Sequence, residues 1–491
     1  MERSAGILLP VFSLPGPYGI GSLGREARAF ADFLHNAGQK WWQVLPVGPT
    51  GAGNSPYTSV STFAGNPLLI DLEDLRDRGL LTEGELSAAR ALEGVPIDYA
   101  ALYESREPLL RQAFSRLSGT EAQAVRDFAA AAPWLGEYAL YRALKTHFGE
   151  AAWYDWPDKA LRRHDPAALE PWRTALAEDI AFHQTVQSWF FSQWKALKDH
   201  ANSLGVGIIG DLPIYVSLDS ADVWSERKAF LLDETGRPSR VAGVPPDYFS
   251  AEGQLWGNPL YDWAAMKADG FGWWIRRVEG ASRLFDAIRI DHFRAFERYW
   301  SVPAGAETAR EGRWEPGPGL DLLHVLTGWF PHITYIAEDL GLLTPEVHQL
   351  REAAGLPGMK VLEFAFDHPG NAYLPHNYDS RRCICYTGTH DNDTALGWYD
   401  HAAEAERAFA ERYLGASGRE NVRRALLRCG MGSTAELFVA QMQDYLALGG
   451  EGRINVPGVA DGNWRWRMAP GAAAAELAAE IRALTETYGR R

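Results

Sequence analysis

The sequence predicts an α/β fold: a (β/α)8 barrel, or TIM barrel, with large, mainly helical insertions in its βα loops. The first 50 residues alternate a strand-like apolar run, an amphipathic helix and a second apolar run, a rhythm typical of parallel strand pairing. Further along the chain, several strand-like runs end in an acidic residue, namely 205–211, 285–291, 333–338 and 383–391. A (β/α)8 barrel builds its active site from the carboxyl ends of its strands, so we expect these acids to meet at one end of a barrel.

The N-terminal part is expected to supply two strands and a long insertion. We predict strands at residues 8–14 and 42–47 with a helix at 25–36 between them, followed by a Gly- and Pro-rich loop at 48–57. From residue 75 to 204 Ala, Glu, Arg and Leu dominate. Helical spacing is found at 85–92, 109–117, 121–131 and 180–204. This stretch is far longer than an ordinary βα loop, so we interpret it as a helical insertion between the second and third strands.

The remaining strands are predicted from short apolar runs. They are expected at 206–212, 285–291, 333–338, 359–366, 383–387 and 437–441, with a closing helix at 472–488. A second insertion, at 225–284, contains the irregular stretch 241–259 with the aromatic residues Tyr248, Phe249 and Trp256. The whole chain, 1–491, is therefore expected to be one catalytic barrel with two insertions.

The charge and hydropathy of the chain exclude two classes of partner. The net charge is -15 and the pI is near 5.4, whereas binding to nucleic acid or to an anionic membrane surface needs a basic face. No run of about 18 apolar residues is present, so we expect no transmembrane helix. The apolar residues 5–14 lack a basic leader and are interrupted by Pro10, which fits a strand better than a signal peptide. We expect a cytoplasmic protein.

The sequence offers no motif for a metal or a cofactor. Three cysteines are too few for a disulfide framework, and we expect all three to be buried thiols in a reducing compartment. Asp-Asn-Asp at 391–393 resembles the start of a calcium loop, but the Gly and Glu that complete such a loop are missing. Residues 19–24 match Gly-x-Gly-x-x-Gly, yet no acid ends the next strand, which disfavours a dinucleotide site. We therefore expect neither a cofactor nor a metal.

The carboxylates at the strand ends match what glycosidic-bond chemistry requires. Two acids must flank the bond, one to attack or stabilise the sugar cation and one to protonate the leaving oxygen. Arg289 and Asp291 are two residues apart and share a strand face, so the guanidinium is expected to hold that carboxylate ionised. Burial of Glu338 behind an apolar strand would raise its pKa toward that of a general acid, while Asp339 points to the opposite face. A single acid of this kind could equally cap a helix or pair with an arginine.

Six motifs, taken together, carry a family resemblance. They are Ser-Pro-Tyr at 55–57, Gly-Asp-Leu-Pro-Ile-Tyr at 210–215, Val-Pro-Pro-Asp-Tyr-Phe-Ser at 244–250, Arg-Ile-Asp-His-Phe at 289–293, Ala-Glu-Asp-Leu-Gly at 337–341 and Gly-Thr-His-Asp-Asn-Asp-Thr at 388–394. From about residue 5 to residue 466 the chain resembles the amylomaltases, bacterial 4-α-glucanotransferases related to the α-amylases. The resemblance implies a (β/α)8 barrel, a retaining double displacement and α-1,4-glucans as substrates.

The resemblance also implies catalytic roles. Asp291 would be the nucleophile that forms a glucosyl-enzyme, and Glu338 would be the general acid/base. Asp391 would be a third carboxylate that grips sugar hydroxyls and distorts the ring, with His390 beside it.

Further residues would contact the substrate by the same resemblance. Tyr57, Asp211 and Arg289 would line the donor sugar, with Tyr57 stacked on its ring, although Tyr57 could also simply plug the barrel mouth. Tyr99 resembles a residue that touches bound glucan from the insertion.

The choice between transfer and hydrolysis depends on how well the site excludes water. A transferase must keep water away while the covalent intermediate exists, usually with a closing lid. The segment with Asp247, Tyr248 and Phe249, together with Trp256, is well composed for a lid, although it could be an ordinary surface loop. We favour a 4-α-glucanotransferase; an α-1,4-glucan hydrolase on the same barrel and a non-catalytic glucan-binding protein are the alternatives.

Overall fold

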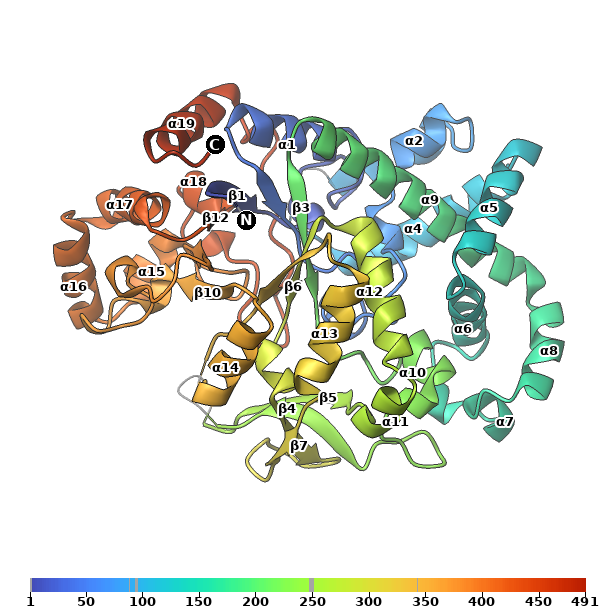
Figure 1. The fold of residues 1–491 in the computed structure, drawn as a ribbon. Helices are drawn as coiled ribbons and strands as arrows, with labels where there is room; N and C mark the ends of the chain where they lie inside the picture. Colours follow the sequence, from blue (N-terminus) through green and yellow to red (C-terminus); the bar gives the residue numbers. More distant parts are fainter. Residues whose placement is uncertain (1, 88, 93–95, 247–250, 342) are drawn as a thin grey trace.

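Eight parallel strands form the centre of the molecule (Figure 1). The structure is a computed structural model that describes residues 2–87, 89–92, 96–246, 251–341 and 343–491. The strands are β1 (Ser4–Leu8), β2 (Trp41–Gln43), β3 (Gly207–Leu212), β6 (Ala287–Ile290), β9 (Thr334–Ala337), β10 (Gly358–Val361), β11 (Cys383–Tyr386) and β12 (Leu437–Gln441). They are almost entirely buried, as expected for parallel strands that are covered by helices.

The sheet closes into a barrel. Its strands follow the order β10-β11-β12-β1-β2-β3-β6-β9, which leaves β9 and β10 as the two ends. Across that seam the backbone N–H of Ala337 donates to the carbonyl of Pro357 at 2.9 Å. The Asp339 carboxylate accepts a hydrogen bond from the backbone N–H of Met359 at 2.7 Å and contacts Arg351 at 2.5 Å. The predicted (β/α)8 barrel is confirmed.

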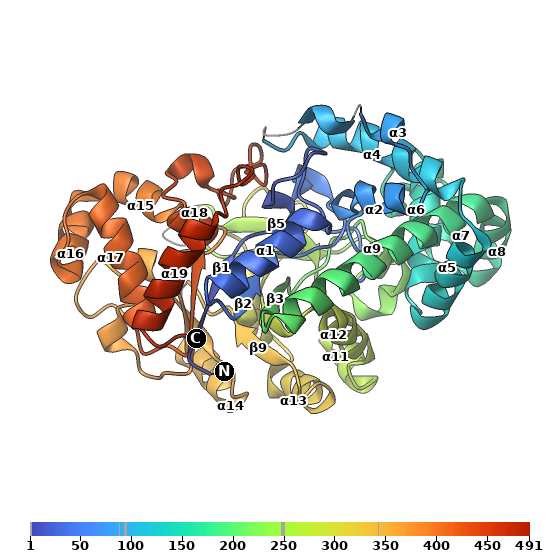
Figure 2. The same cartoon turned by 90° about the horizontal axis from the view of Figure 1, so that it is seen from above.

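Helices surround the barrel on its outer side. The helices that follow barrel strands include α1 (Arg25–Asn36), α9 (Ala177–Ser203), α12 (Gly272–Leu284), α13 (Gly319–Trp329), α14 (Pro345–Ala353), α17 (Arg419–Gly432) and α19 (Ala475–Thr487). Helices α15 (Ala395–His401) and α16 (Glu404–Leu414) extend the β11–β12 connection, and short α18 (Met442–Tyr445) follows β12. Seen from above, α15 to α17 and the helices between β2 and β3 lie on opposite sides of the barrel (Figure 2).

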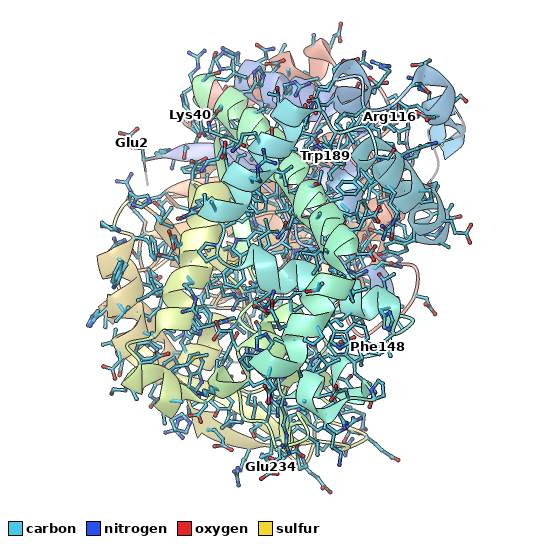
Figure 3. All side chains as sticks on the ribbon, turned by 90° about the vertical axis from the view of Figure 1, so that its right-hand side faces the viewer. Glu2, Lys40, Arg116, Phe148, Trp189 and Glu234 are labelled. Atoms are coloured by element: carbon cyan, nitrogen blue, oxygen red, sulfur yellow. The ribbon has the colours of Figure 1, made fainter. Side chains whose placement is uncertain are left out.

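The connection between β2 and β3 is almost wholly helical. It contains α2 (Leu72–Asp77), α3 (Glu83–Ser87), α4 (Tyr99–Phe114), α5 (Gly119–Ala131), α6 (Leu135–His147), α7 (Lys159–Arg162) and α8 (Pro166–Ala175) before α9. Figure 3 looks onto this side, with Trp189 labelled on α9. Only 1% of Trp189 is exposed, because α9 packs against α4, α5 and α6 as well as against the barrel. The predicted helices at 121–131 and 180–204 are confirmed, whereas 85–92 is divided between α3 and a 3-10 turn at Ala89–Leu92.

A second, antiparallel sheet covers one end of the barrel strands and was not predicted. It has the order β5-β4-β7-β8, with β4 (Arg240–Val244), β5 (Gln254–Pro259), β7 (Arg298–Pro303) and β8 (Arg313–Pro316). The expectation of an irregular stretch at 241–259 was therefore wrong at both ends. Strand β4 was hidden because its partner β7 lies about 60 residues away at Trp300–Pro303, and β5, which pairs with β4, lies in a polar, glycine-containing stretch. The insertion between β3 and β6 also holds α10 (Ala221–Ser225) and α11 (Trp263–Ala268).

Several predicted boundaries also needed correction. The first strand is Ser4–Leu8 and overlaps the predicted range 8–14 only at Leu8, because Pro10 has no N–H for the ladder and a 3-10 turn follows at Val11–Ser13. The strands predicted at 42–47 and 359–366 are each shorter, and a 3-10 turn at Leu362–Phe364 ends the second of them. Among the three free cysteines, Cys429 is half-buried instead of buried. No helix in the described part of the chain is both long and apolar enough to cross a membrane.

Candidate active site

Two acidic residues leave neighbouring barrel strands at the same level. Strands β6 and β9 are paired so that Ile290 lies opposite Ala337, which places Asp291 and Glu338 at the next position of each strand. The backbone N–H of Glu338 donates to the carbonyl of Ile290 at 3.0 Å and fixes this alignment. Because adjacent strands lie about 4.8 Å apart, both acids emerge side by side at the carboxyl end of the barrel.

Arg289 links Asp291 to a third carboxylate on strand β3. Its Nη1 lies 2.7 Å from both oxygens of Asp211 and 2.9 Å from Oδ1 of Asp291. The guanidinium and the Asp211 carboxylate are buried, whereas 28% of the Asp291 side chain stays exposed. The paired strands β3 and β6 set this contact, since Asp211 lies opposite Arg289 in the register. Of these groups, the Asp291 carboxylate is therefore the one open to a ligand.

Arg289 was expected to hold the Asp291 carboxylate ionised, but Arg289 is not the largest influence on the pKa of that carboxyl. Burial is the largest effect and raises the pKa of the Asp291 carboxyl well above its ordinary value. Arg289 lowers that pKa, but the like charges of Asp211, Glu338 and Asp391 oppose it. One arginine thus serves two carboxylates, Asp211 and Asp291, and the titration of Asp291 depends on that of Glu338 beside it.

Glu338 is held by two backbone N–H groups. Its Oε2 accepts from the N–H of His292 at 2.7 Å and its Oε1 accepts from the N–H of Leu340 at 2.9 Å. Burial raises the pKa of the Glu338 carboxyl, as predicted, while Arg289 and the two N–H donors lower it. Asp339 contributes a small further rise, so its charge is felt although its own oxygens are bound to Met359 and Arg351.

His292 has a left-handed backbone that turns its N–H toward Glu338. Its φ is 53°, in the left-handed region that only a few per cent of residues other than Gly adopt. The imidazole meets the ring of Trp256 edge-on, with the centroids 4.7 Å apart and the planes at 80°. Trp256 lies on β5 and is 38% exposed, so an aromatic surface borders the residue that orients Glu338.

Asp391 approaches the same end of the barrel from the loop after β11. Its Oδ1 accepts a hydrogen bond from Asn455 Nδ2 at 2.6 Å and lies 3.3 Å from His390 Nε2. Arg453 donates to the Asp391 carbonyl at 2.7 Å. The side chain of Asp391 is 45% exposed, whereas that of His390 is 3% exposed, and burial lowers the pKa of the His390 imidazole. A neutral histidine therefore supports a carboxylate that faces solvent.

Tyr57 connects the two halves of the site. Its hydroxyl donates to Asp211 Oδ2 at 2.6 Å, and its ring stacks on that of His390 with centroids 5.1 Å apart and planes at 17°. Trp464 packs on both rings, at 5.8 Å from Tyr57 and 6.0 Å from His390. One face of Tyr57 is thus already covered by His390, so stacking on a sugar is left to the remainder of the ring.

Tyr99 is placed where direct contact with glucan does not fit. Only 6% of it is exposed, and its hydroxyl donates to the carbonyl of Trp464 at 3.0 Å. Tyr103, one turn further along α4, is 46% exposed, with its ring 6.4 Å from that of Tyr99. Tyr99 therefore supports the backbone of Trp464 rather than presenting a surface.

The expected lid also included three residues of the β4–β5 connection. Asp247, Tyr248 and Phe249 lie outside the described residues. The flanking strands β4 and β5 are paired with each other and bring Trp256 next to His292.

Sequence reasoning missed four residues that shape the site: His292, Arg453, Asn455 and Trp464. His292 follows Asp291 directly, and its unusual backbone could not be inferred from its identity. Asn455 and Trp464 come more than 60 positions after Asp391 in an irregular segment without a periodic pattern. Among the residues that the structure describes, no group of three or more His, Cys, Asp or Glu side chains is arranged to hold a metal ion.

Comparison with known proteins gives a consistent family. The family model described as 4-alpha-glucanotransferase matches residues 9–473. A 4-alpha-glucanotransferase of Thermus thermophilus is 50% identical over 505 aligned positions, which cover 100% of this chain and 99% of that protein. The chloroplastic/amyloplastic 4-alpha-glucanotransferase of Solanum tuberosum is 44% identical and covers 100% of this chain and 87% of that protein.

Solved structures agree with the sequence comparison. The amylomaltase of Streptococcus agalactiae, solved in complex with acarbose, superposes with a TM-score of 0.97 at 38% identity, and the match covers 100% of each chain. The amylomaltase of Corynebacterium glutamicum shares the fold with a TM-score of 0.80 at 17% identity, covering 100% of this chain and 75% of that one. The chain belongs to the 4-alpha-glucanotransferase family.

Proposed function

We propose that this 4-α-glucanotransferase moves segments of α-1,4-glucans between chains by a retaining double displacement at Asp291 and Glu338. The observation that carries the proposal is that Asp291 and Glu338 occupy equivalent positions at the ends of two adjacent parallel strands. Arg289 is bound to Asp291, and two backbone N–H groups are bound to Glu338. Retaining enzymes need their two carboxyl groups about 5–5.5 Å apart, which is close to the spacing of neighbouring strands.

In the first step the Asp291 carboxylate attacks the anomeric carbon of the donor sugar. Its exposed part faces the ligand side, and the Arg289 guanidinium stabilises the ionised form. The glycosidic bond breaks as Glu338 gives its proton to the leaving oxygen, so a shortened chain with a free 4-hydroxyl departs. The product on the protein is a glycosyl ester of Asp291, and Glu338 is left ionised with both oxygens bound to N–H groups.

In the second step the ester is transferred to an acceptor. Glu338 takes the proton from the 4-hydroxyl of an incoming glucan, whose oxygen attacks the same anomeric carbon and releases Asp291. Two inversions restore the α configuration. Asp391, held by Asn455 with its side chain 45% exposed, is available to bind hydroxyls of the sugar ring at both steps.

Exclusion of water decides whether the ester is transferred or hydrolysed. Trp256, exposed at the edge of β5 and in contact with His292, offers an apolar surface over the acid/base side. We propose that Asp247, Tyr248 and Phe249, in the same β4–β5 connection, complete a lid over the ester.

The test is incubation of the purified protein with maltotriose. Transfer yields a ladder of longer and shorter maltooligosaccharides, whereas a hydrolase yields only glucose and maltose. Absence of any turnover, with Asp291→Asn as the inactive control, would support a glucan-binding protein without catalysis. A ladder that needs neither Asp291 nor Glu338 would contradict the assigned roles.

We also propose that the enzyme works in the cytoplasm, needs no cofactor and binds neither nucleic acid nor membranes. The three free cysteines fit a reducing compartment, and the net charge of -15 fits a neutral substrate. Fractionation of cells that express the tagged protein tests the location.

A further inference from the structure

A buried carboxyl group lies beneath the loop that carries His390 and Asp391. Glu363 follows β10, in the 3-10 turn Leu362–Phe364, and only 7% of it is exposed. Its backbone N–H donates to the carbonyl of Thr387 at 3.2 Å, which ties it to the end of β11. A Cβ built on Gly388 would lie 2.6 Å from Glu363 Oε1, so this oxygen is pressed against the backbone three residues before Asp391.

The surroundings of Glu363 do not suit a carboxylate ion. Its Oε1 is buried and has no hydrogen-bond partner. Among the described residues no Lys, Arg or His lies within ion-pair distance of it, and Arg453 is only a more distant opposing charge. Two other acids, Asp444 and Asp393, lie near enough for their negative charges to oppose its ionisation. A hydrogen bond with Asn392 favours the ionised form, but a buried carboxylate that has one oxygen without a partner and two acids nearby is still disfavoured.

The two neighbouring acids have donors of their own. Asp444 accepts from Thr387 Oγ1 at 2.5 Å and from the Ala395 N–H at 2.8 Å. Asp393 accepts from the Thr394 N–H at 2.8 Å and lies 3.2 Å from His401 Nδ1. If one of the three acids retains a proton, the contacts therefore select Glu363. Burial and the charges of Asp444 and Asp393 raise the pKa of the Glu363 carboxyl well above its ordinary value, in agreement with the contacts.

A second buried oxygen near Glu363 also lacks a hydrogen-bond donor. Gln441 Oε1 is buried without a partner, and the Gln441 amide borders Gly388 on the same side as Glu363 Oε1. The other end of that amide is fixed, because Gln441 Nε2 donates to the Asp393 carbonyl at 2.8 Å. The Asn392 side chain is hydrogen-bonded to Glu363, which partly lowers the pKa of Glu363, and its Oδ1 accepts from the Thr389 N–H at 3.0 Å. The loop 387–393 is thus packed against the side chains of Glu363, Gln441 and Asn392.

We infer that Glu363 is a positioning residue that acts as a neutral carboxylic acid and holds the loop bearing His390 and Asp391 in its working position. The inference rests on the proposed role of Asp391 in binding the sugar. Ionisation of Glu363 would place three negative charges under the loop and displace it. Glu363 does not touch the reacting atoms in this account; its effect passes through residues 387–393.

The test compares Glu363→Gln, Glu363→Ala and the matched surface change Glu404→Gln, which alters an exposed glutamate at the start of α16. A glutamine carries a donor and an acceptor like the neutral acid, so Glu363→Gln is expected to keep kcat for maltotriose transfer within about twofold of the wild type. Glu363→Ala is expected to lose about ten- to hundredfold in kcat, because the loop shifts relative to the other carboxylates. Infrared spectra at pH 7 should show the carbonyl band of a protonated acid in the wild type and in Glu404→Gln. The difference spectrum of the wild type minus Glu363→Gln should show that this band is lost in the variant.

Three results would overturn the inference. They are a Glu363→Gln enzyme as impaired as Glu363→Ala, full activity in both variants, or an infrared spectrum in which Glu363→Gln removes no protonated-acid band. Should Glu363→Ala fail to fold, Glu363→Gln and the infrared band still decide the matter. Failure of the proposed function would appear separately, as a wild type that does not transfer from maltotriose while the band is present.

Discussion

Arg289 Nη1 lies 2.7 Å from both oxygens of Asp211 and 2.9 Å from Asp291 Oδ1. Asp211 is the residue paired with Arg289 on the adjacent strand β3. One buried guanidinium therefore binds two carboxylates, and only part of its electrostatic stabilisation acts on the ionised form of Asp291. This arrangement leaves Asp291 sensitive to small changes at Arg289.

Replacing Arg289 by Lys tests that sensitivity. The shorter ammonium reaches both carboxylates less well, so the pKa of Asp291 should rise further and less of the nucleophile is ionised at a given pH. We expect kcat/KM to fall by at least about tenfold and its acidic limb to move to higher pH. Arg298→Lys, at an exposed arginine on β7, is the matched control and should leave the pH profile in place. An unchanged acidic limb in Arg289→Lys would show that Arg289 does not tune Asp291.

Asn455 is expected to matter for kcat although it is remote in sequence. Asn455→Ala removes the hydrogen bond of 2.6 Å to Asp391 Oδ1. We expect kcat for maltotriose to fall by about tenfold, the lower end of what one hydrogen bond to a charged group contributes, because Asp391 is partly exposed. Steady-state kinetics of Asn455→Ala and of the exposed Asn421→Ala give the comparison. Equal kcat values in the two variants would show that Asn455 does not contribute to catalysis through Asp391.

The raised pKa of Asp291 makes a prediction about stability. A carboxyl group whose pKa is higher in the folded state than in the unfolded state binds more protons when folded. The free energy of unfolding therefore falls as pH rises from the unfolded pKa through the folded one. Asp291→Asn removes that charge and keeps an acceptor for Arg289, so it should raise the Tm at pH 7 by about 1–3 °C and have little effect near pH 4. Calorimetry at both pH values measures this change. A lower Tm at pH 7 would show that ionised Asp291 does not destabilise the folded protein.

The segment with Tyr248 and Phe249 is expected to control the ratio of transfer to hydrolysis. Tyr248→Ser or Phe249→Ser should increase free glucose relative to longer oligosaccharides formed from maltotriose, because water then reaches the ester more often. Trp256→Ser should act in the same direction, since Trp256 borders His292. Chromatography of the products over time measures the ratio. Ratios equal to that of the wild type would mean that another element excludes water.

The barrel and its carboxylates were predictable because their signals are local. Apolar runs ending in Asp291 and Glu338 mark strands and their carboxyl ends, and parallel pairing then brings the acids together. Strand β4 was missed since it pairs with β7, about 60 positions away, and β5 was missed with it because β5 pairs with β4. The roles of Asn455 and Trp464 depend on how an irregular segment folds back over Asp391, and the left-handed backbone of His292 is set by its tertiary surroundings. Such contacts leave no periodic trace in a sequence.

The covalent ester on Asp291 is the central claim, and it can be observed directly. Glu338→Gln removes the acid/base, but α-maltosyl fluoride still reacts in the first step because fluoride departs without a proton. The second step then lacks its base, so the intermediate should accumulate. Mass spectrometry of the digested protein is predicted to find a maltosyl group on the peptide that contains Asp291. An adduct on another residue, or turnover of the fluoride to the β-configured product without any adduct, would contradict the account.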